Sequence, residues 1–208
     1  VMPITVYEIL QDAQIVSEVY FAVGLLSLVI ALLVPWMSRY VPRRYLYSSG
    51  CLTYLSGSLL ALTGTAAGVI AGLAMLTVAT VVTFISINAY LLDYIEKSQI
   101  GKVETTKLFY SALGWTLGPG LGVTLKTWWE PAPFLIAAMA AFCMLAVFLY
   151  LRLGNGKLIT RAKAPAPNPL AFLPRFLAQP RLIAGWLFAV IRSCGWWVYV
   201  VYMPIYVV

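Results

Sequence analysis

Residues 68–92 read GVIAGLAMLTVATVVTFISINAYLL, a run without a charged side chain. In hydrocarbon every backbone amide must find its hydrogen-bond partner within the protein, so such a run is expected to fold as a helix. The run exceeds the roughly 20 residues that a helix needs to cross the apolar core of a bilayer. A transmembrane barrel would require alternating apolar and polar residues, and this stretch does not alternate. The sequence therefore predicts a membrane-spanning helix here.

The chain as a whole is also rich in apolar residues and poor in charged ones. Of its 208 residues, 62% are hydrophobic and 10% are charged, whereas an ordinary globular domain is about a quarter charged. We therefore predict an all-α integral membrane protein, a polytopic helix bundle in which short connections make consecutive helices antiparallel neighbours. The predicted spans, about six in number, cover residues 19–38, 45–63, 68–95, 108–126, 132–151 and 182–208.

Basic residues collect in every second connection of this arrangement. Segments 39–44, 96–107 and 152–181 contain every lysine and arginine except Lys126 and Arg192. The other connections are mainly acidic, so the positive-inside rule places the three basic segments in the cytoplasm of a multi-pass protein of the cell membrane. The net charge of +7 is typical of loops beside anionic lipid and requires no nucleic-acid partner.

Prolines divide the chain into two parts. Residues 154–181 contain five prolines among scattered basic residues, and proline prevents a continuous helix. We predict that this cytoplasmic linker joins residues 19–153, five helices of an N-terminal half, to residues 182–208, the first helix of a C-terminal half. Residues 1–18 are expected to form an outer loop or the end of a preceding helix. We expect the chain to be a fragment that lacks helices at both ends.

Residues 114–122 read GWTLGPGLG and carry the strongest local pattern. Gly114, Gly118 and Gly122 lie on one helical face, where glycine lets another backbone approach closely. Pro119 removes one helix hydrogen bond and bends the axis. A packing seam without any role in transport is an equally open interpretation of this pattern.

The series Gly114, Gly118, Pro119 and Gly122 resembles the fifth-helix motif of the major facilitator superfamily, the one associated with antiporters, with Val123 in place of the family's last glycine. The resemblance covers nearly the whole chain, as family helices two to seven. It implies two six-helix halves that rock about a central site, with the glycine motif as a flexible packing seam between them.

A second motif lies in residues 35–44, which resemble the family's loop between its second and third helices. The family's aspartate falls on Arg39, so the charge relay of the family is not expected here. Arg43 and Arg44 match its basic positions, and the resemblance implies a gating role for the cluster of Arg39, Arg43 and Arg44. A cytoplasmic turn with arginines is also what topology alone predicts.

Arg192 is the sharpest single residue, because it falls near the middle of the last predicted span. A charge at that depth costs at least about 2.5 kcal/mol on insertion scales. Trp196 and Tyr199 share its helical face, while the opposite face is aliphatic. In a water-filled cavity Arg192 would bind an anionic group, and the rings would hold a flat or apolar body. A structural ion pair with another helix is an equally open interpretation.

The third predicted span carries polar residues at membrane depth. Thr83 and Ser86 lie on one face and Asn88 on the opposite face, and such groups should look into protein or water. Because the resemblance implies that the family's fourth and seventh helices line the cavity, we expect these three residues to contact substrate. Ordinary interhelical hydrogen bonding is the alternative.

These features favour a secondary active transporter of a small molecule that works by alternating access. The glycine motif suggests efflux as the direction of transport, and proton coupling is the form of coupling that the resemblance to antiporters implies. The alternative is a major-facilitator-like membrane protein without transport activity, which acts as a sensor or an assembly partner. We predict no enzyme, catalytic residue, metal or cofactor, because the chain has no histidine and its three cysteines lack metal-ligand spacing.

Overall fold

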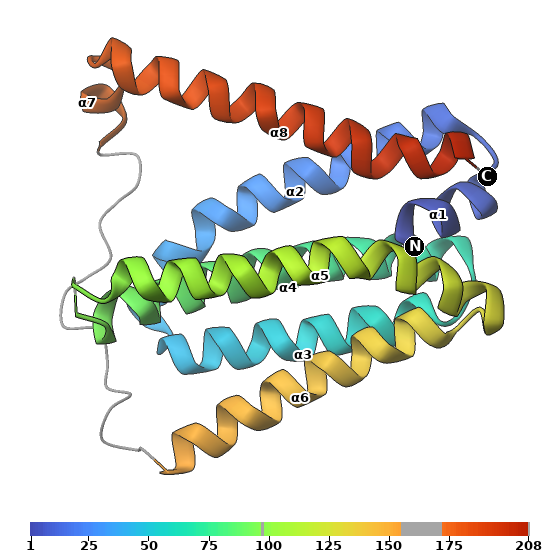
Figure 1. The fold of residues 1–208 in the computed structure, drawn as a ribbon, viewed down its shortest axis with the longest axis horizontal. Coiled ribbons are helices and arrows are strands. Elements are labelled where there is room, and N and C mark those ends of the chain that lie inside the picture. The colour runs from blue at the N-terminus through green and yellow to red at the C-terminus, as the bar shows by residue number, and fades with distance from the viewer. Residues whose placement is uncertain (97, 155–171, 208) are drawn as a thin grey trace.

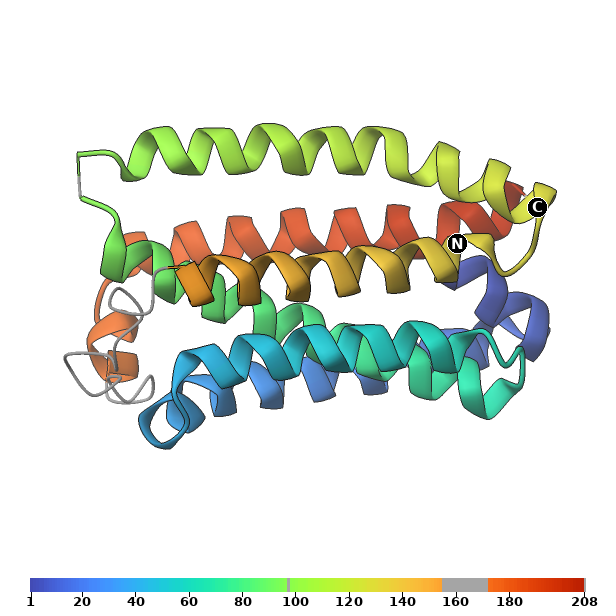
Figure 2. The same cartoon turned by 90° about the horizontal axis from the view of Figure 1, so that it is seen from below.

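The computed structural model describes residues 1–96, 98–154 and 172–207, and in these ranges it contains helices and no strand. In chain order the helices are α1 (Met2–Leu10), α2 (Ala13–Tyr40), α3 (Arg43–Ala61), α4 (Ala66–Tyr94), α5 (Ile100–Trp128), α6 (Ala132–Gly154), α7 (Leu173–Leu177) and α8 (Pro180–Val207). The six long helices lie side by side, and the chain reverses direction at each connection between them (Figures 1 and 2).

This architecture confirms an all-α polytopic membrane protein. In the part of the chain that the structure describes, four helices are long and apolar enough to cross a bilayer, over Ala13–Ser38, Ala66–Leu92, Ala132–Leu151 and Pro180–Tyr202. Helices α3 and α5 are more polar, because α3 begins with two arginines and α5 carries three lysines and a glutamate. Both nevertheless run alongside the apolar helices (Figure 2).

The helices extend beyond the apolar stretches that predicted them. Helix α2 begins at Ala13 rather than residue 19, because the carboxylate of Asp12 accepts hydrogen bonds from the backbone N–H groups of Gln14 and Ile15. Helix α5 begins at Ile100 rather than residue 108, since its polar first turns continue the helix. Within residues 1–18, α1 and the start of α2 are helical.

The prolines of the predicted linker fall mostly on residues 155–171, which lie outside the described residues. Of the predicted linker, the structure describes residue 154 at the end of α6, the short helix α7 and the first residues of α8. Helix α7 lies at the same end of the bundle as the connection between α2 and α3 and the connection between α4 and α5 (Figure 1).

Helices α3 and α4 form the closest contact in the bundle, and glycine makes it possible. A Cβ added at Gly72 would lie 2.8 Å from the carbonyl oxygen of Gly57 and 3.1 Å from the Cβ of Ala61. A Cβ at Gly50 would lie 2.7 Å from Cγ2 of Thr83. Without a hydrophobic force between helices in lipid, such small-residue contacts provide the packing that holds them together.

The two ends of the bundle differ in charge and in packing. We call the end with segments 39–44, 96–107 and α7 the basic end, and the other the acidic end (Figure 1). At the acidic end, Ser17 of α2 and Tyr202 of α8 are hydrogen-bonded at 2.6 Å. Lys126 of α5 forms an ion pair there with Glu8 of α1. From this junction α2 and α8 diverge toward the basic end (Figure 1).

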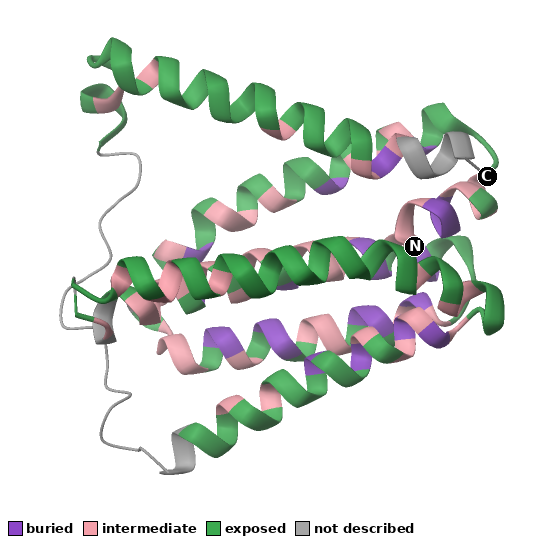
Figure 3. Ribbon diagram, in the orientation of Figure 1, coloured by how far each residue is buried: buried purple, intermediate pink, exposed green. Residues whose placement is uncertain are grey.

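Buried residues are unevenly distributed among the helices. They lie mainly in α1, α2, α3, α4 and α6, whereas α5 has none, and α8 is exposed along nearly its whole described length (Figure 3). The core cluster contains Val6, Val16, Val23, Val69 and Leu73, where α1, α2 and α4 meet. Helices α5 and α8 therefore stand apart from the tightly packed part of the bundle.

We predict that the substitution Gly72→Val destabilises the protein, because the new side chain would force α3 and α4 apart. Overpacking of this kind costs about 1–3 kcal/mol, so the apparent melting temperature of the detergent-solubilised protein should fall by several degrees. The matched control is Gly24→Val, since no described residue lies within 4 Å of a Cβ placed at Gly24. Equal melting temperatures for the two variants would contradict the prediction.

Candidate functional site

An open groove lies between α5 and α8, and we take it as the candidate site. Its volume is about 680 Å³, within the range of small-molecule sites. The lining consists of one tryptophan from α5 and six consecutive or nearly consecutive positions of α8, namely Trp115, Arg192, Ser193, Gly195, Trp196, Trp197 and Tyr199. The structure thus brings Arg192, Trp196 and Tyr199 together at one surface.

The helical repeat of α8 explains this grouping. Arg192, Trp196 and Tyr199 follow one another at spacings of four and three residues, which places them on one face of an α-helix. The rings of Trp196 and Tyr199 have centroids 6.3 Å apart and planes tilted by 35°. Trp115 meets Trp196 edge to face, with centroids 5.3 Å apart and planes at 79°. An edge-to-face contact of this kind is a favoured geometry of aromatic pairs.

Arg192 supplies the charge of the groove. It lies about 18 Å along α8 from the start of the helix at Pro180. Among the described residues no carboxylate pairs with its guanidinium, and the other side chains that line the groove carry no formal charge at neutral pH. The groove therefore combines a single guanidinium, which offers five N–H donors, with aromatic walls.

The polar residues of α4 lie elsewhere. Thr83 packs against Gly50 of α3, and its hydroxyl donates to the carbonyl oxygen of Ala79 in its own helix at 2.7 Å. Ser86 is 3% exposed, and its hydroxyl has no hydrogen-bond partner among the described residues. The structure brings neither residue to the groove that contains Arg192.

Asn88 faces the start of α5 instead. Its side-chain oxygen accepts a hydrogen bond of 2.9 Å from the ammonium group of Lys107, which also forms a 2.7 Å ion pair with Glu104. The lysine also lies over the ring of Phe84, 5.8 Å from its centroid. This polar cluster therefore connects α4 to α5 near the basic end.

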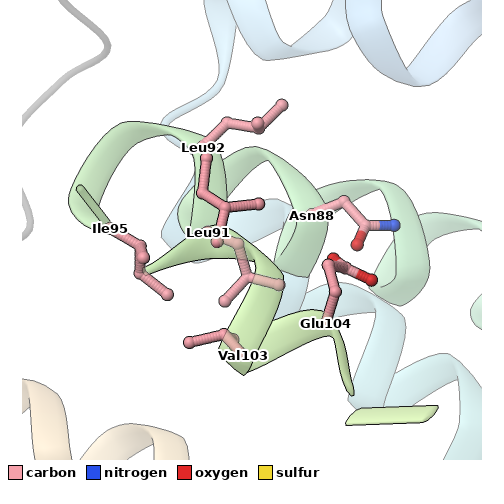
Figure 4. Close-up of a pocket in the computed structure, with 7 residues that line it drawn as sticks. Asn88, Leu91, Leu92, Ile95, Val103 and Glu104 are labelled. Carbon is pink, nitrogen blue, oxygen red and sulfur yellow. The ribbon is translucent and has the colours of Figure 1, made fainter. Parts of the chain in front are cut away.

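A small hollow of about 200 Å³ adjoins this cluster, where α4 turns into α5 (Figure 4). Asn88 and Glu104 are its polar residues, and the other lining side chains are aliphatic, namely Leu91, Leu92, Ile95, Ile100 and Val103. The hollow is therefore mostly apolar, and its volume is less than a third of that of the groove between α5 and α8.

The glycine motif lies on an open face of α5. Nothing in the described chain lies within 4 Å of a Cβ placed at Gly114 or Gly118, and a Cβ at Gly122 would meet only the side chain of Val1. Helix α5 continues through Pro119. Within this part of the chain, no helix occupies the packing seam that the motif led us to expect.

The arginines of the second motif lie at the start of α3. The guanidinium of Arg43 donates to the carbonyl oxygen of Ala89 in α4 at 3.2 Å. Arg44 lies over the ring of Tyr45, 4.7 Å from its centroid. The side chain of Arg39 lies outside the described residues. Arg43 thus attaches α3 to α4 at the basic end.

The sequence-based prediction missed Ser193, Gly195 and Trp197 of the lining and, on the neighbouring helix α5, Trp115. Trp115 directly follows Gly114 and so lies within the glycine motif, but the sequence of α5 does not predict that this tryptophan contacts α8. A tryptophan beside an interhelical glycine series is the signal that could have found it.

No group of three metal-ligating side chains occurs among the described residues.

A family model described as Major Facilitator Superfamily matches residues 1–208. The chain belongs to the major facilitator superfamily. This match confirms the resemblance carried by the glycine motif and residues 35–44. No match was found among curated proteins or among solved structures. Membership identifies a multi-pass membrane protein of the transporter type, since major facilitator proteins are transporters rather than enzymes.

We predict that Asn88→Leu loosens the start of α5, because Lys107 loses its acceptor on α4. Hydrogen bonds that involve a charged group contribute about 1.5–3 kcal/mol. Backbone amides around residues 100–107 should therefore exchange with deuterium faster, as measured by mass spectrometry. Thr105→Val is the matched control, since that hydroxyl donates to the carbonyl oxygen of Gly101 in its own helix. Unchanged exchange in Asn88→Leu would show that the cluster does not anchor α5.

Proposed function

We propose that this major facilitator protein is a secondary active transporter that moves a small molecule by alternating access, with the groove between α5 and α8 as its substrate site. The observation that carries the proposal is the position of Arg192, a single guanidinium at mid-helix depth in a groove with aromatic walls. An ionisable residue at that depth in a membrane helix usually marks a substrate or ion pathway.

The packing of the two ends supports this proposal. The Ser17–Tyr202 hydrogen bond joins α2 to α8 at the acidic end, and the two helices diverge toward the basic end (Figure 1). Arg192 lies about 15 Å along α8 from Tyr202. Along α8 the groove therefore lies between the end that is joined to α2 and the end that diverges from it, as a site reached alternately from the two sides would be.

The charge distribution gives these ends a direction. We assign the basic end to the cytoplasm by the positive-inside rule, so the arrangement corresponds to a state that is closed outside and open inside. The glycine motif of α5 favours efflux as the direction of transport. We propose proton coupling as well, but we assign it no proton-carrying residue, because the described lining of the groove contains no carboxylate that could bind and release a proton.

Alternating access predicts that a cysteine in the groove is labelled from either side of the membrane. In full-length protein with its other cysteines replaced, Ser193→Cys should react with an impermeant maleimide both in intact cells and in inside-out vesicles. Adding Tyr202→Phe removes the hydrogen bond to Ser17, worth about 1 kcal/mol. The population open to the outside, and with it the rate of outside labelling, should then rise up to fivefold.

The matched control is Tyr110→Phe, which removes an exposed hydroxyl from α5 and should leave the rate of outside labelling unchanged. Labelling of Ser193→Cys from one side alone, in the parent and in Tyr202→Phe, would contradict alternating access. It would favour a major facilitator protein that has kept the fold without transport.

A further inference from the structure

The groove between α5 and α8 also indicates which chemical class it selects. Its charge comes from Arg192 alone, because the other lining residues are serine, glycine, tyrosine and tryptophan. Aromatic walls by themselves would attract organic cations through their π faces. A guanidinium on the same surface repels a second positive charge, so the groove as a whole favours an anion.

The depth of Arg192 strengthens this preference. Where hydrocarbon replaces water, an unpaired guanidinium is costly, and an anionic ligand would offset that cost. Arginine presents two parallel N–H groups that match the two oxygens of a carboxylate. No carboxylate of the described chain takes that position, so the donors remain available to a ligand.

The aromatic side chains define the second half of the ligand. Trp196 lies one helical turn from Arg192, about 6 Å along the axis, and Tyr199 about 10 Å. Trp115 closes this part of the groove from α5, with its ring 5.3 Å from that of Trp196. A flat ring joined to an acidic group by one or two bonds therefore reaches both the guanidinium and the aromatic walls.

Resting on the transport function proposed above, we propose that the groove selects aromatic carboxylates, with the carboxylate bound at Arg192 and the ring held by Trp115, Trp196 and Tyr199. The volume of about 680 Å³ accommodates a bicyclic ring together with water. Neutral and cationic compounds with the same ring bind more weakly, because they lack the charge that Arg192 recognises.

Four probes test this selectivity in the purified full-length protein by isothermal titration calorimetry. Indole-3-acetate is anionic, tryptophol has the same ring without the charge, tryptamine carries the opposite charge, and acetate has the charge without the ring. Indole-3-acetate should bind at least about tenfold more tightly than each of the other three. Equal binding of tryptophol, or tighter binding of tryptamine, would overturn the proposal.

Variants assign the preference to the groove. Arg192→Gln should bring the affinity for indole-3-acetate close to that for tryptophol, while Arg181→Gln, an arginine of the same helix outside the groove, should leave it unchanged. Trp115→Leu should weaken both indole ligands several-fold without changing their ratio. An anion preference that survives in Arg192→Gln, with the protein still monodisperse, would overturn the assignment.

Binding and transport are measured separately, so the two proposals fail in different ways. Selective binding of indole-3-acetate without labelling of Ser193→Cys from both sides would refute alternating access and leave the ligand class intact. Labelling from both sides, together with indole ligands that bind regardless of charge, would refute the ligand class and leave transport intact.

Discussion

The fold depends on one constraint, which is that hydrocarbon offers no hydrogen-bond partner to a peptide group. Helices satisfy this constraint segment by segment, and several hydroxyl side chains follow the same rule. Thr77, Thr83 and Ser58 each donate to the carbonyl oxygen four residues earlier in their own helix. Such side chains are satisfied without a neighbour, so helices can pack through small residues. The approach of Gly57 to Gly72 is one such case, since a Cβ added at Gly72 would lie 2.8 Å from the carbonyl oxygen of Gly57.

Other polar side chains mark contacts between helices, and some of them are bonded within their own helix as well, as Ser17 is to Ala13 and Lys107 to Glu104. Lys107 of α5 donates to Asn88 of α4, and Arg43 of α3 donates to the carbonyl oxygen of Ala89 in α4. The hydroxyls of Ser17 in α2 and Tyr202 in α8 are hydrogen-bonded to each other. Arg192 differs from these groups because it lies near the middle of its helix and no carboxylate of the described chain pairs with its guanidinium. The same constraint that makes the other polar groups structural therefore makes this one a candidate for ligand binding.

The sequence predicts the helices well because each long apolar run has few alternatives in lipid. It predicts their ends poorly, since Asp12 extends α2 by capping, a local effect outside the apolar run. Periodicity along α8 was enough to group Arg192 with Trp196, because one helix fixes their spacing. The polar residues of α4 were expected to contact substrate together. In the structure they face different neighbours, since Thr83 contacts α3 and Asn88 contacts α5. Which neighbour lies against which face is a property of the bundle and not of one helix.

The position of Trp115 gives the groove a mechanical consequence. Helix α5 precedes residues 155–171 in the sequence and α8 follows them, and neither helix contributes to the core cluster. A ligand held between Trp115 and Arg192 would contact both helices and would bind best at one separation between them. Any ligand with such a preference shifts the population toward the arrangement that it fits. The proposed site would therefore sense the relative position of the two helices, which alternating access requires to change.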